Sequence, residues 1–241
     1  MCAKCLAKPE PLAAEHACIA CGTPFLSAFP LDAEGRCGLC RRGLNGFDAA
    51  RAYGVYEKEL RELIHLFKYG RVQPLARPLA KFLALAMPRD QRFDAIVPMP
   101  LHWWKRWRRG FNQAELLAAE LSRRTGIRVI RAARRIRATS VQAGLTSAKR
   151  RENVRGAFRV PSKHAVADKR ILLVDDVMTT GATAGACALA LKRAGAAHVT
   201  LLTLARADRR LAIAPRGTAL KRFPDLPTFG SLDDAQFGSL A

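Results

Sequence analysis

The sequence predicts an α/β domain with a mostly parallel sheet flanked by helices, preceded by a small module that carries cysteines. Residues 171–174 read ILLV, and a short run of consecutive apolar residues is typical of a parallel strand buried on both faces. Residues 184–194 are rich in alanine and predict a helix after a short polar turn. Two Cys-x-x-Cys pairs lie upstream of these elements.

Length and composition are those of a globular chain. Its 241 residues are 49% hydrophobic, which suffices for one main domain and an appendage. The last part carries Pro, Gly and short polar runs without periodicity, which predicts disorder. We therefore predict a metal-binding module, a main α/β domain and a disordered tail, at residues 1–47, 48–210 and 211–241.

The charge balance limits the class of ligand. Lys and Arg number 41 against 20 Asp and Glu, a net charge of +21, which favours polyanionic ligands such as pyrophosphate or nucleic acid. An arginine-rich coding bias is an alternative source of part of this excess. No run of about 18 apolar residues exists and the first residues lack the apolar core of a signal peptide, so we expect no membrane insertion and a cytoplasmic protein.

The spacing of four cysteines predicts a structural Zn²⁺ site. Two pairs are separated by 15 residues, so two knuckles can each offer two sulfurs to a tetrahedral ion; the predicted ligands are Cys18, Cys21, Cys37 and Cys40. Cys2 and Cys5 form a third pair, which extends the site, competes for it, or is the remnant of a longer arrangement. His16 is a substitute ligand or a solvent-exposed histidine.

Hydrophobic periodicity gives the order of the remaining elements. Strands are expected at residues 48–56, 93–97, 127–130 and 199–205. Helices are expected at residues 57–69 and 74–87, and from near Asn112.

The loop at residues 98–110 is dense in cations and tryptophans. It follows a predicted strand, and parallel sheets bind ligands beyond the carboxyl ends of their strands. The candidate pyrophosphate ligands there are Arg106, Arg108 and Arg109. The candidate nucleic-acid contacts are Trp103, Trp104 and Trp107, which either pack against the protein or stack on the bases of a single strand.

A second long polar segment is a candidate mobile lid. Residues 138–157 are basic, punctuated by glycine and too long for a simple turn. Lys149, Arg150 and Arg151 would arrive at the site with this lid. A solvated charged loop is the alternative.

The predicted strand at residues 171–174 leads directly into a phosphate-binding pattern. Asp175 and Asp176 stand at its end, and small residues and threonines then precede the alanine-rich helix: Thr179, Thr180, Gly181, Ala182 and Thr183. Backbone N–H groups, hydroxyls and a helix N-terminus can hold a phosphate, while two acids can accept hydrogen bonds from vicinal hydroxyls. Together they suggest a ribose 5-phosphate held end to end.

Several segments carry a family resemblance. The cysteine module is followed by FKYGRVQPLARPLA, VPMPLH, RRGFNQAELLA, RATSVQAGLTSAKRRENVRGAF and ILLVDDVMTTGATAGACALALKRAGA. In this order, residues 18–206 resemble the ComF family of competence-associated phosphoribosyltransferase-like proteins. The resemblance implies a type I phosphoribosyltransferase core behind a zinc ribbon.

The resemblance also implies a substrate and a role. The substrate is phosphoribosyl pyrophosphate (PRPP), with Mg²⁺; Asp175 and Asp176 are the implied catalytic residues that hold the ribose hydroxyls, and residues 179–183 hold the 5-phosphate. The implied reaction transfers the phosphoribosyl group to an unidentified nitrogenous acceptor, linked to single-stranded DNA and competence-machinery proteins in natural transformation. The alternative is a non-catalytic PRPP or nucleotide sensor that binds single-stranded DNA.

Overall fold

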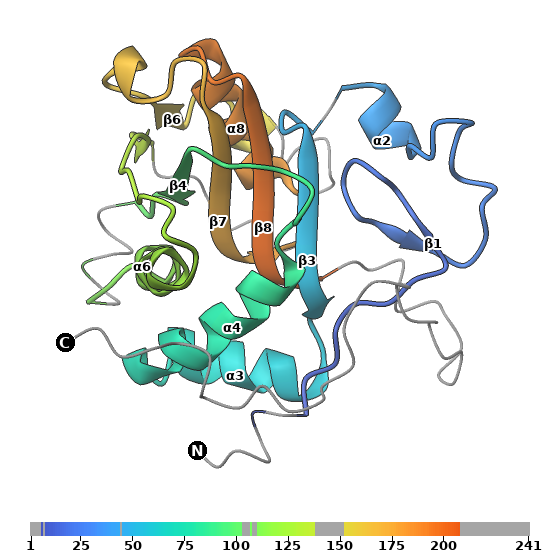
Figure 1. The fold of residues 1–241 in the computed structure, drawn as a ribbon, viewed down its shortest axis with the longest axis horizontal. Helices are drawn as coiled ribbons and strands as arrows, with labels where there is room; N and C mark the ends of the chain where they lie inside the picture. The colour runs from blue at the N-terminus through green and yellow to red at the C-terminus, as the bar shows by residue number, and fades with distance from the viewer. Residues whose placement is uncertain are drawn as a thin grey trace.

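A four-stranded parallel sheet forms the centre of the computed structural model, which describes residues 6, 8–43, 45–102, 107, 110–137 and 152–207. The strand order is β3-β8-β7-β4, and every neighbouring pair is parallel (Figure 1). The bounds are Ala49–Val55 for β3, His198–Arg206 for β8, Arg170–Met178 for β7 and Ala95–Pro98 for β4. The parallel sheet expected from the apolar strand pattern is therefore confirmed.

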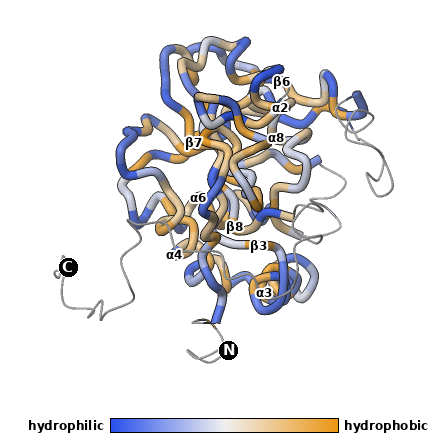
Figure 2. Tube along the Cα trace, turned by 90° about the vertical axis from the view of Figure 1, so that its right-hand side faces the viewer, coloured by the Kyte–Doolittle hydropathy of each residue, from blue (hydrophilic) through white to orange (hydrophobic). Residues whose placement is uncertain are grey.

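Helices cover both faces of this sheet. The first three are α3 (Lys58–Lys68), α4 (Ala76–Ala86) and α6 (Gln113–Thr125), which pack on one face through a shared apolar core; the other face is covered by α8 (Ala182–Arg193). Along β7 the side chains alternate, with Leu172 and Val174 in the first core and Ile171 and Leu173 in the second. This alternation explains why the strand is apolar at every position. Figure 2 shows hydrophobic segments around β7 and mostly hydrophilic outer loops.

The amphipathic helices follow their sequence patterns closely. In α3 the buried residues are Leu60, Leu63, Ile64 and Phe67, spaced to lie on one face. Asn112 caps α6, because its side-chain oxygen accepts a hydrogen bond from the Ala114 N–H at 3.1 Å. The helix predicted at residues 74–87 begins instead as a short 3₁₀ turn, η1 (Gln73–Leu75). None of the helices within the described ranges is long and apolar enough to span a bilayer.

Strand β7 is longer than the sequence pattern indicated. Asp175 and Asp176 were expected just after the strand, but they lie within it, and the strand ends at Met178. The reason is β8, which continues alongside, so that Asp175 pairs with Thr203 and Met178 with Arg206. The acids therefore have the rigid backbone of a paired strand.

The strand expected at residues 127–130 is reduced to one bridge, in which Val129 lies parallel to Ile96 of β4. The structure also contains two short strands that the sequence did not predict, β5 (Arg134–Arg135) and β6 (Phe158–Arg159). They form an antiparallel ladder. A 3₁₀ turn, η2 (Lys163–Ala165), then leads toward β7. The ladder joins the two ends of the predicted lid, whose residues 138–151 lie outside the described ranges.

The N-terminal module is a small ribbon beside β3. It contains the antiparallel strands β1 (His16–Ala17) and β2 (Pro24–Phe25) and the short helix α2 (Gly38–Arg41) (Figure 1). The ribbon is connected to the sheet by backbone hydrogen bonds, among them one from the Ala50 N–H to the Ala20 carbonyl at 2.6 Å. The tail predicted at residues 211–241 lies outside the described part of the chain.

Candidate functional site

The four cysteines of the ribbon form one cluster. The sulfurs of Cys18, Cys21, Cys37 and Cys40 all lie within 4.8 Å of one another. The Cys18 and Cys40 sulfurs are 3.6 Å apart, and those of Cys21 and Cys37 are 3.7 Å apart. A tetrahedral zinc ion with Zn–S bonds of about 2.3 Å requires sulfurs about 3.8 Å apart, so the cluster has the dimensions and ligand chemistry for Zn²⁺.

Neighbouring groups complete the surroundings of these sulfurs. The Asn45 side-chain amide donates to Cys40 Sγ at 3.0 Å, and the Cys37 N–H donates to Cys18 Sγ at 3.3 Å. Donors of this kind stabilise thiolates and orient metal ligands. His16 lies in β1 and is not part of the cluster, while Cys2 and Cys5 are outside the described residues.

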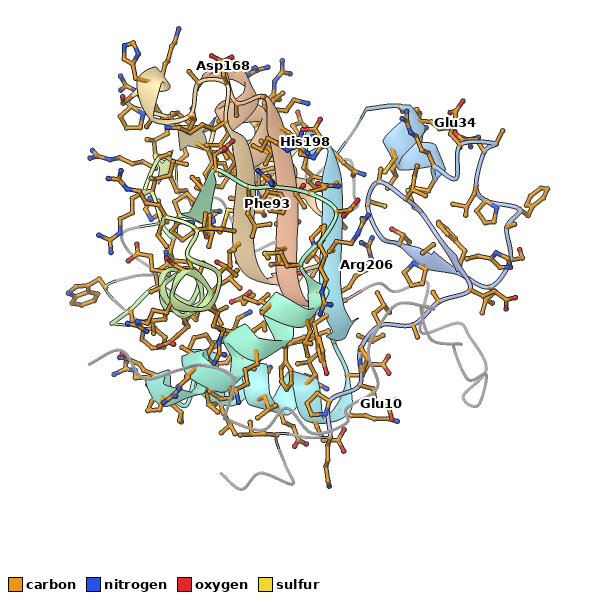
Figure 3. The ribbon with its side chains drawn as sticks, viewed as in Figure 1. Glu10, Glu34, Phe93, Asp168, His198 and Arg206 are labelled. Atoms are coloured by element: carbon orange, nitrogen blue, oxygen red, sulfur yellow. The ribbon has the colours of Figure 1, made fainter. Side chains whose placement is uncertain are left out.

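A buried arginine connects the ribbon to the sheet. Arg206, at the end of β8, is 4% exposed and donates to the Cys21 carbonyl at 2.7 Å and to the Thr23 hydroxyl (Figure 3). Thr23 is itself fully buried and its hydroxyl lies 2.9 Å from Cys21 Sγ. Since Arg206 pairs with Met178 of β7, the ribbon is attached to the same end of the sheet as the acid pair.

The acid pair has a lysine partner that sequence reasoning missed. Lys68, the last residue of α3, places its ammonium nitrogen 2.8 Å from Asp176 Oδ1, and the two side chains are only 14% and 13% exposed. Asp175 accepts a hydrogen bond from the Asp176 N–H at 2.9 Å. The signal in the sequence was the spacing, because Lys68 follows the buried Ile64 by four residues and so lies on the apolar stripe of α3.

Burial and charge perturb the ionisation of this cluster. Burial, and next the charge of Asp176, raise the pKa of Asp175 to about 7. Burial alone lowers the pKa of Lys68, but the nearby carboxylates of Asp176 and Asp175 outweigh it and the pKa is raised. Burial lowers the pKa of Arg135, against the opposing effect of Asp175. Perturbed groups gathered at the end of a parallel strand are typical of functional sites.

Arg135 lies just before the predicted lid and interacts electrostatically with Asp175. It lies in β5 directly opposite Phe158 of β6, with its guanidinium carbon 5.5 Å from the centre of the Phe158 ring. Nearby, the Arg137 guanidinium donates to the Arg155 carbonyl at 3.3 Å. The β5–β6 ladder therefore holds the two ends of the lid segment together, and the charge of Asp175 acts on the pKa of Arg135.

The turn after β7 has the backbone of a phosphate-binding loop. Gly181 adopts φ +75° and precedes the first residue of α8, so the helix N-terminus follows the acid pair by a few residues. A β-carbon on Gly181 would also lie 3.3 Å from the Phe47 ring, so both conformation and space favour glycine. Thr180 accepts a long hydrogen bond from the Ala182 N–H at 3.4 Å, and Thr179 is exposed. Together these residues can present N–H groups and hydroxyls to an anion.

The remaining predicted ligands fall mostly outside the described residues. This applies to the candidate pyrophosphate and lid cations Arg106, Arg108, Arg109, Lys149, Arg150 and Arg151, and to Trp103 and Trp104. Trp107 is described, and its side chain is 74% exposed.

Comparisons with known proteins give the family of the chain. Residues 107–225 match the family described as phosphoribosyl transferase domain. Competence protein F of Haemophilus influenzae is 36% identical over 179 residues, which cover 71% of this chain and 78% of that protein. The DNA utilization protein YhgH of Escherichia coli is 34% identical over 197 residues, which cover 78% of this chain and 83% of that protein.

Solved structures give weaker matches. Glutamine PRPP amidotransferase from B. subtilis, complexed with ADP and GMP, matches at 22% identity and a TM-score of 0.37, over 52% of this chain and 25% of that one. UMP synthase of Leishmania donovani matches at 19% identity and a TM-score of 0.33, over 58% of this chain and 22% of that one.

Proposed function

Because the chain belongs to the ComF family of phosphoribosyltransferase-like competence proteins, we propose that it binds PRPP with Mg²⁺ and transfers the phosphoribosyl group to a nitrogenous acceptor. One observation carries the proposal. Asp175 and Asp176 lie on the last part of a buried parallel strand, and the same chain turns within a few residues into the N-terminus of α8. Carboxylates that can accept hydrogen bonds from ribose hydroxyls thus lie beside backbone N–H groups that can donate to a phosphate.

Each part of this arrangement has a role in the proposal. Asp175 and Asp176 accept hydrogen bonds from the ribose 2- and 3-hydroxyls. The N–H groups at the start of α8, together with the hydroxyls of Thr180 and Thr183, hold the 5-phosphate. Carboxylate and substrate oxygens are the ligands that Mg²⁺ prefers, and when bound it would neutralise charge on the pyrophosphate.

The proposed reaction is a substitution at the ribose C1. The bond from C1 to the pyrophosphate oxygen breaks, and a bond from C1 to the acceptor nitrogen forms. The protein assists by holding the ribose at both ends and by keeping water away from the oxocarbenium-like sugar, which suits a lid based on the β5–β6 ladder. A cytoplasmic location belongs to the same proposal.

Titration calorimetry of the zinc-loaded protein with PRPP and Mg²⁺ tests binding. The Asp175→Asn/Asp176→Asn variant should lose PRPP binding while keeping its circular dichroism spectrum. The matched control is Asp90→Asn/Asp168→Asn, which removes the same charge from two exposed positions. Figure 3 shows Asp168 near the N-terminal end of β7. Wild-type PRPP affinity in the acid-pair variant would refute the site. Pyrophosphate release with a panel of nitrogenous bases then tests transfer.

A second candidate function is a PRPP or nucleotide sensor that binds single-stranded DNA without catalysis. The observation that favours it is the exposed Trp107 in a stretch of sequence rich in Arg, together with the names of the relatives, competence protein F and DNA utilization protein YhgH. Affinity for single-stranded DNA should then fall steeply with salt and drop when Trp103, Trp104 and Trp107 become alanine. An unchanged affinity in the triple variant would remove base stacking from the proposal.

A further inference from the structure

The position of Lys68 is fixed by the packing of its helix. The preceding residue, Phe67, is fully buried and its ring centre lies 5.9 Å from that of Phe111. Ile64, one turn earlier, is also fully buried in the core against the sheet. With this backbone held in place, the Lys68 side chain reaches Asp176 at 2.8 Å and is itself largely buried. The ammonium group therefore has a defined place in the acid cluster.

Stability alone does not account for this lysine. Removing an ammonium and a carboxylate from water costs several kcal/mol per ion, and apolar replacements of buried ion pairs are often neutral or stabilising. Ordering the long lysine side chain adds a further entropic cost. Asp175 adds a second carboxylate close by, since its Oδ1 accepts a hydrogen bond from the Asp176 N–H at 2.9 Å. The Lys68–Asp176 pair is better explained by a ligand that binds to both the ammonium and the carboxylate group.

The proposed substrate would compete with Lys68 for the same oxygen. Asp176 Oδ1 accepts from the lysine in the free protein, and in the proposed function the same carboxylate accepts from a ribose hydroxyl. In PRPP the pyrophosphate is attached to C1, next to the C2 hydroxyl, whereas the 5-phosphate is at the other end of the sugar. If Asp176 binds the 2-hydroxyl, a cation released from this carboxylate lies nearer the pyrophosphate than the 5-phosphate.

We propose that Lys68 is a pyrophosphate-binding residue that the ribose hydroxyls displace from Asp176 when PRPP binds. This inference rests on the proposed function and assigns a further residue to that site. Lys68 loses no proton in the exchange, because it stays an ammonium ion and passes from a carboxylate to the phosphoryl oxygens. Lys68 would then favour PRPP over ribose 5-phosphate, which has the same sugar and 5-phosphate but no pyrophosphate.

A comparison of two ligands in matched variants tests the proposal. Titration calorimetry with Mg²⁺ measures the affinity of the wild type, Lys68→Met and Lys68→Arg for PRPP and for ribose 5-phosphate. Lys68→Met should weaken PRPP binding about tenfold or more, the size of one charge-assisted hydrogen bond, and change ribose 5-phosphate binding by less than about threefold. Lys68→Arg should keep most of the preference for PRPP. Arg61→Met removes an exposed cation from the same helix and should change neither affinity.

Each other outcome overturns the proposal. An equal loss for both ligands would mean that Lys68 only positions the acid pair, and unchanged PRPP affinity would mean that it takes no part in binding. If the wild type binds neither ligand, the proposed function fails and the inference fails with it. If the wild type binds PRPP and only the variants depart from expectation, the inference about Lys68 fails and the proposed function stands. Circular dichroism checks folding, and Lys68→Gln replaces Lys68→Met in the same measurement if the methionine variant does not fold.

Discussion

Gly46 of the ribbon and Gly185 of α8 lie backbone against backbone. A β-carbon on Gly46 would be 2.3 Å from the Gly185 carbonyl oxygen, and one on Gly185 would be 2.1 Å from the Asn45 carbonyl oxygen. Asn45 in turn donates to the sulfur of Cys40. Two adjacent residues, Asn45 and Gly46, therefore connect the cysteine cluster to the helix that begins at the phosphate loop.

We expect Gly185→Ala to destabilise the protein. In an open helix this change would stabilise by about 1 kcal/mol, because alanine is the better helix former. Here the added methyl group overlaps a backbone oxygen, so we expect the free energy of unfolding to fall by about 1–3 kcal/mol in urea denaturation. Gly38→Ala is the control, since its nearest neighbour is 3.6 Å away, at the flexible end of Arg41. A stabilised Gly185→Ala variant would contradict this contact.

Asn45 is expected to tune the affinity of the cysteine cluster for zinc. Asn45→Ala removes the N–H donor to Cys40 Sγ, and loss of such a partner typically weakens metal binding by 10- to 100-fold. Competition with a chromogenic chelator measures this affinity. Arg42→Ala, which changes an exposed residue of the same ribbon, is the control and should bind zinc like the wild type. Equal zinc affinity in the Asn45 and Arg42 variants would show that the amide does not support the metal.

Removal of zinc should also weaken PRPP binding. The ribbon supports α8 at Gly185, and the Phe47 ring lies next to Gly181 in the phosphate loop, so a loosened ribbon would no longer hold either position. Chelation should lower the melting temperature first, and PRPP affinity measured below that temperature should fall several-fold. Re-addition of Zn²⁺ should restore both. Unchanged PRPP affinity in the metal-free protein would show that the ribbon does not affect PRPP binding.

Arg206 should contribute strongly to the attachment of the ribbon. Arg206→Met keeps most of the side-chain volume but leaves the Cys21 carbonyl and the Thr23 hydroxyl without this donor. A buried group that loses its hydrogen-bond partner costs about 1–3 kcal/mol. We expect a drop of this size in the free energy of unfolding. Arg170→Met, at the first residue of β7 and so at the other end of the sheet, serves as the comparison, and an equal effect of both would argue against a specific role for Arg206.

Patterns within single elements predicted the parallel sheet and the cysteine cluster. The apolar run at residues 171–174 predicted a strand buried on both faces, and α8 and α3 do bury those faces. The two Cys-x-x-Cys pairs predicted the cluster that the ribbon forms. These predictions succeed because periodicity and short spacings are properties of the local chain.

Contacts between distant residues could not be predicted in the same way. Lys68 and Asp176 are 108 positions apart (176 minus 68), and only the packing of α3 against the sheet brings them together. The length of β7 depends on β8, which pairs with it as far as Met178. The β5–β6 ladder is two residue pairs long, too short to give a period-2 pattern.

The ionisation of Asp175 should make stability depend on pH. Its pKa rises from 3.8 to about 7 on folding, so between these values the folded state binds the proton more tightly than the unfolded state. The free energy of unfolding should therefore fall as the pH rises from about 4 to about 7. Asp175→Asn cannot ionise, so over this interval its free energy of unfolding should rise relative to that of the wild type by roughly 4 kcal/mol, at about 1.4 kcal/mol per unit of pKa difference. Melting temperatures at pH 5, 6, 7 and 8 measure this difference.

The same ionisation should affect the proposed ligand in the opposite direction. A charged carboxylate accepts stronger hydrogen bonds from ribose hydroxyls than a neutral one, so PRPP affinity should rise as Asp175 loses its proton near pH 7. Binding would then release protons, and the calorimetric heat at pH 6.5 should vary with the ionisation enthalpy of the buffer. Asp168→Asn, with Asp175 intact, should behave like the wild type in both experiments. A constant difference in melting temperature between Asp175→Asn and the wild type at all four pH values would mean that Asp175 ionises at its ordinary pKa, and the pH-dependent binding would fall with it.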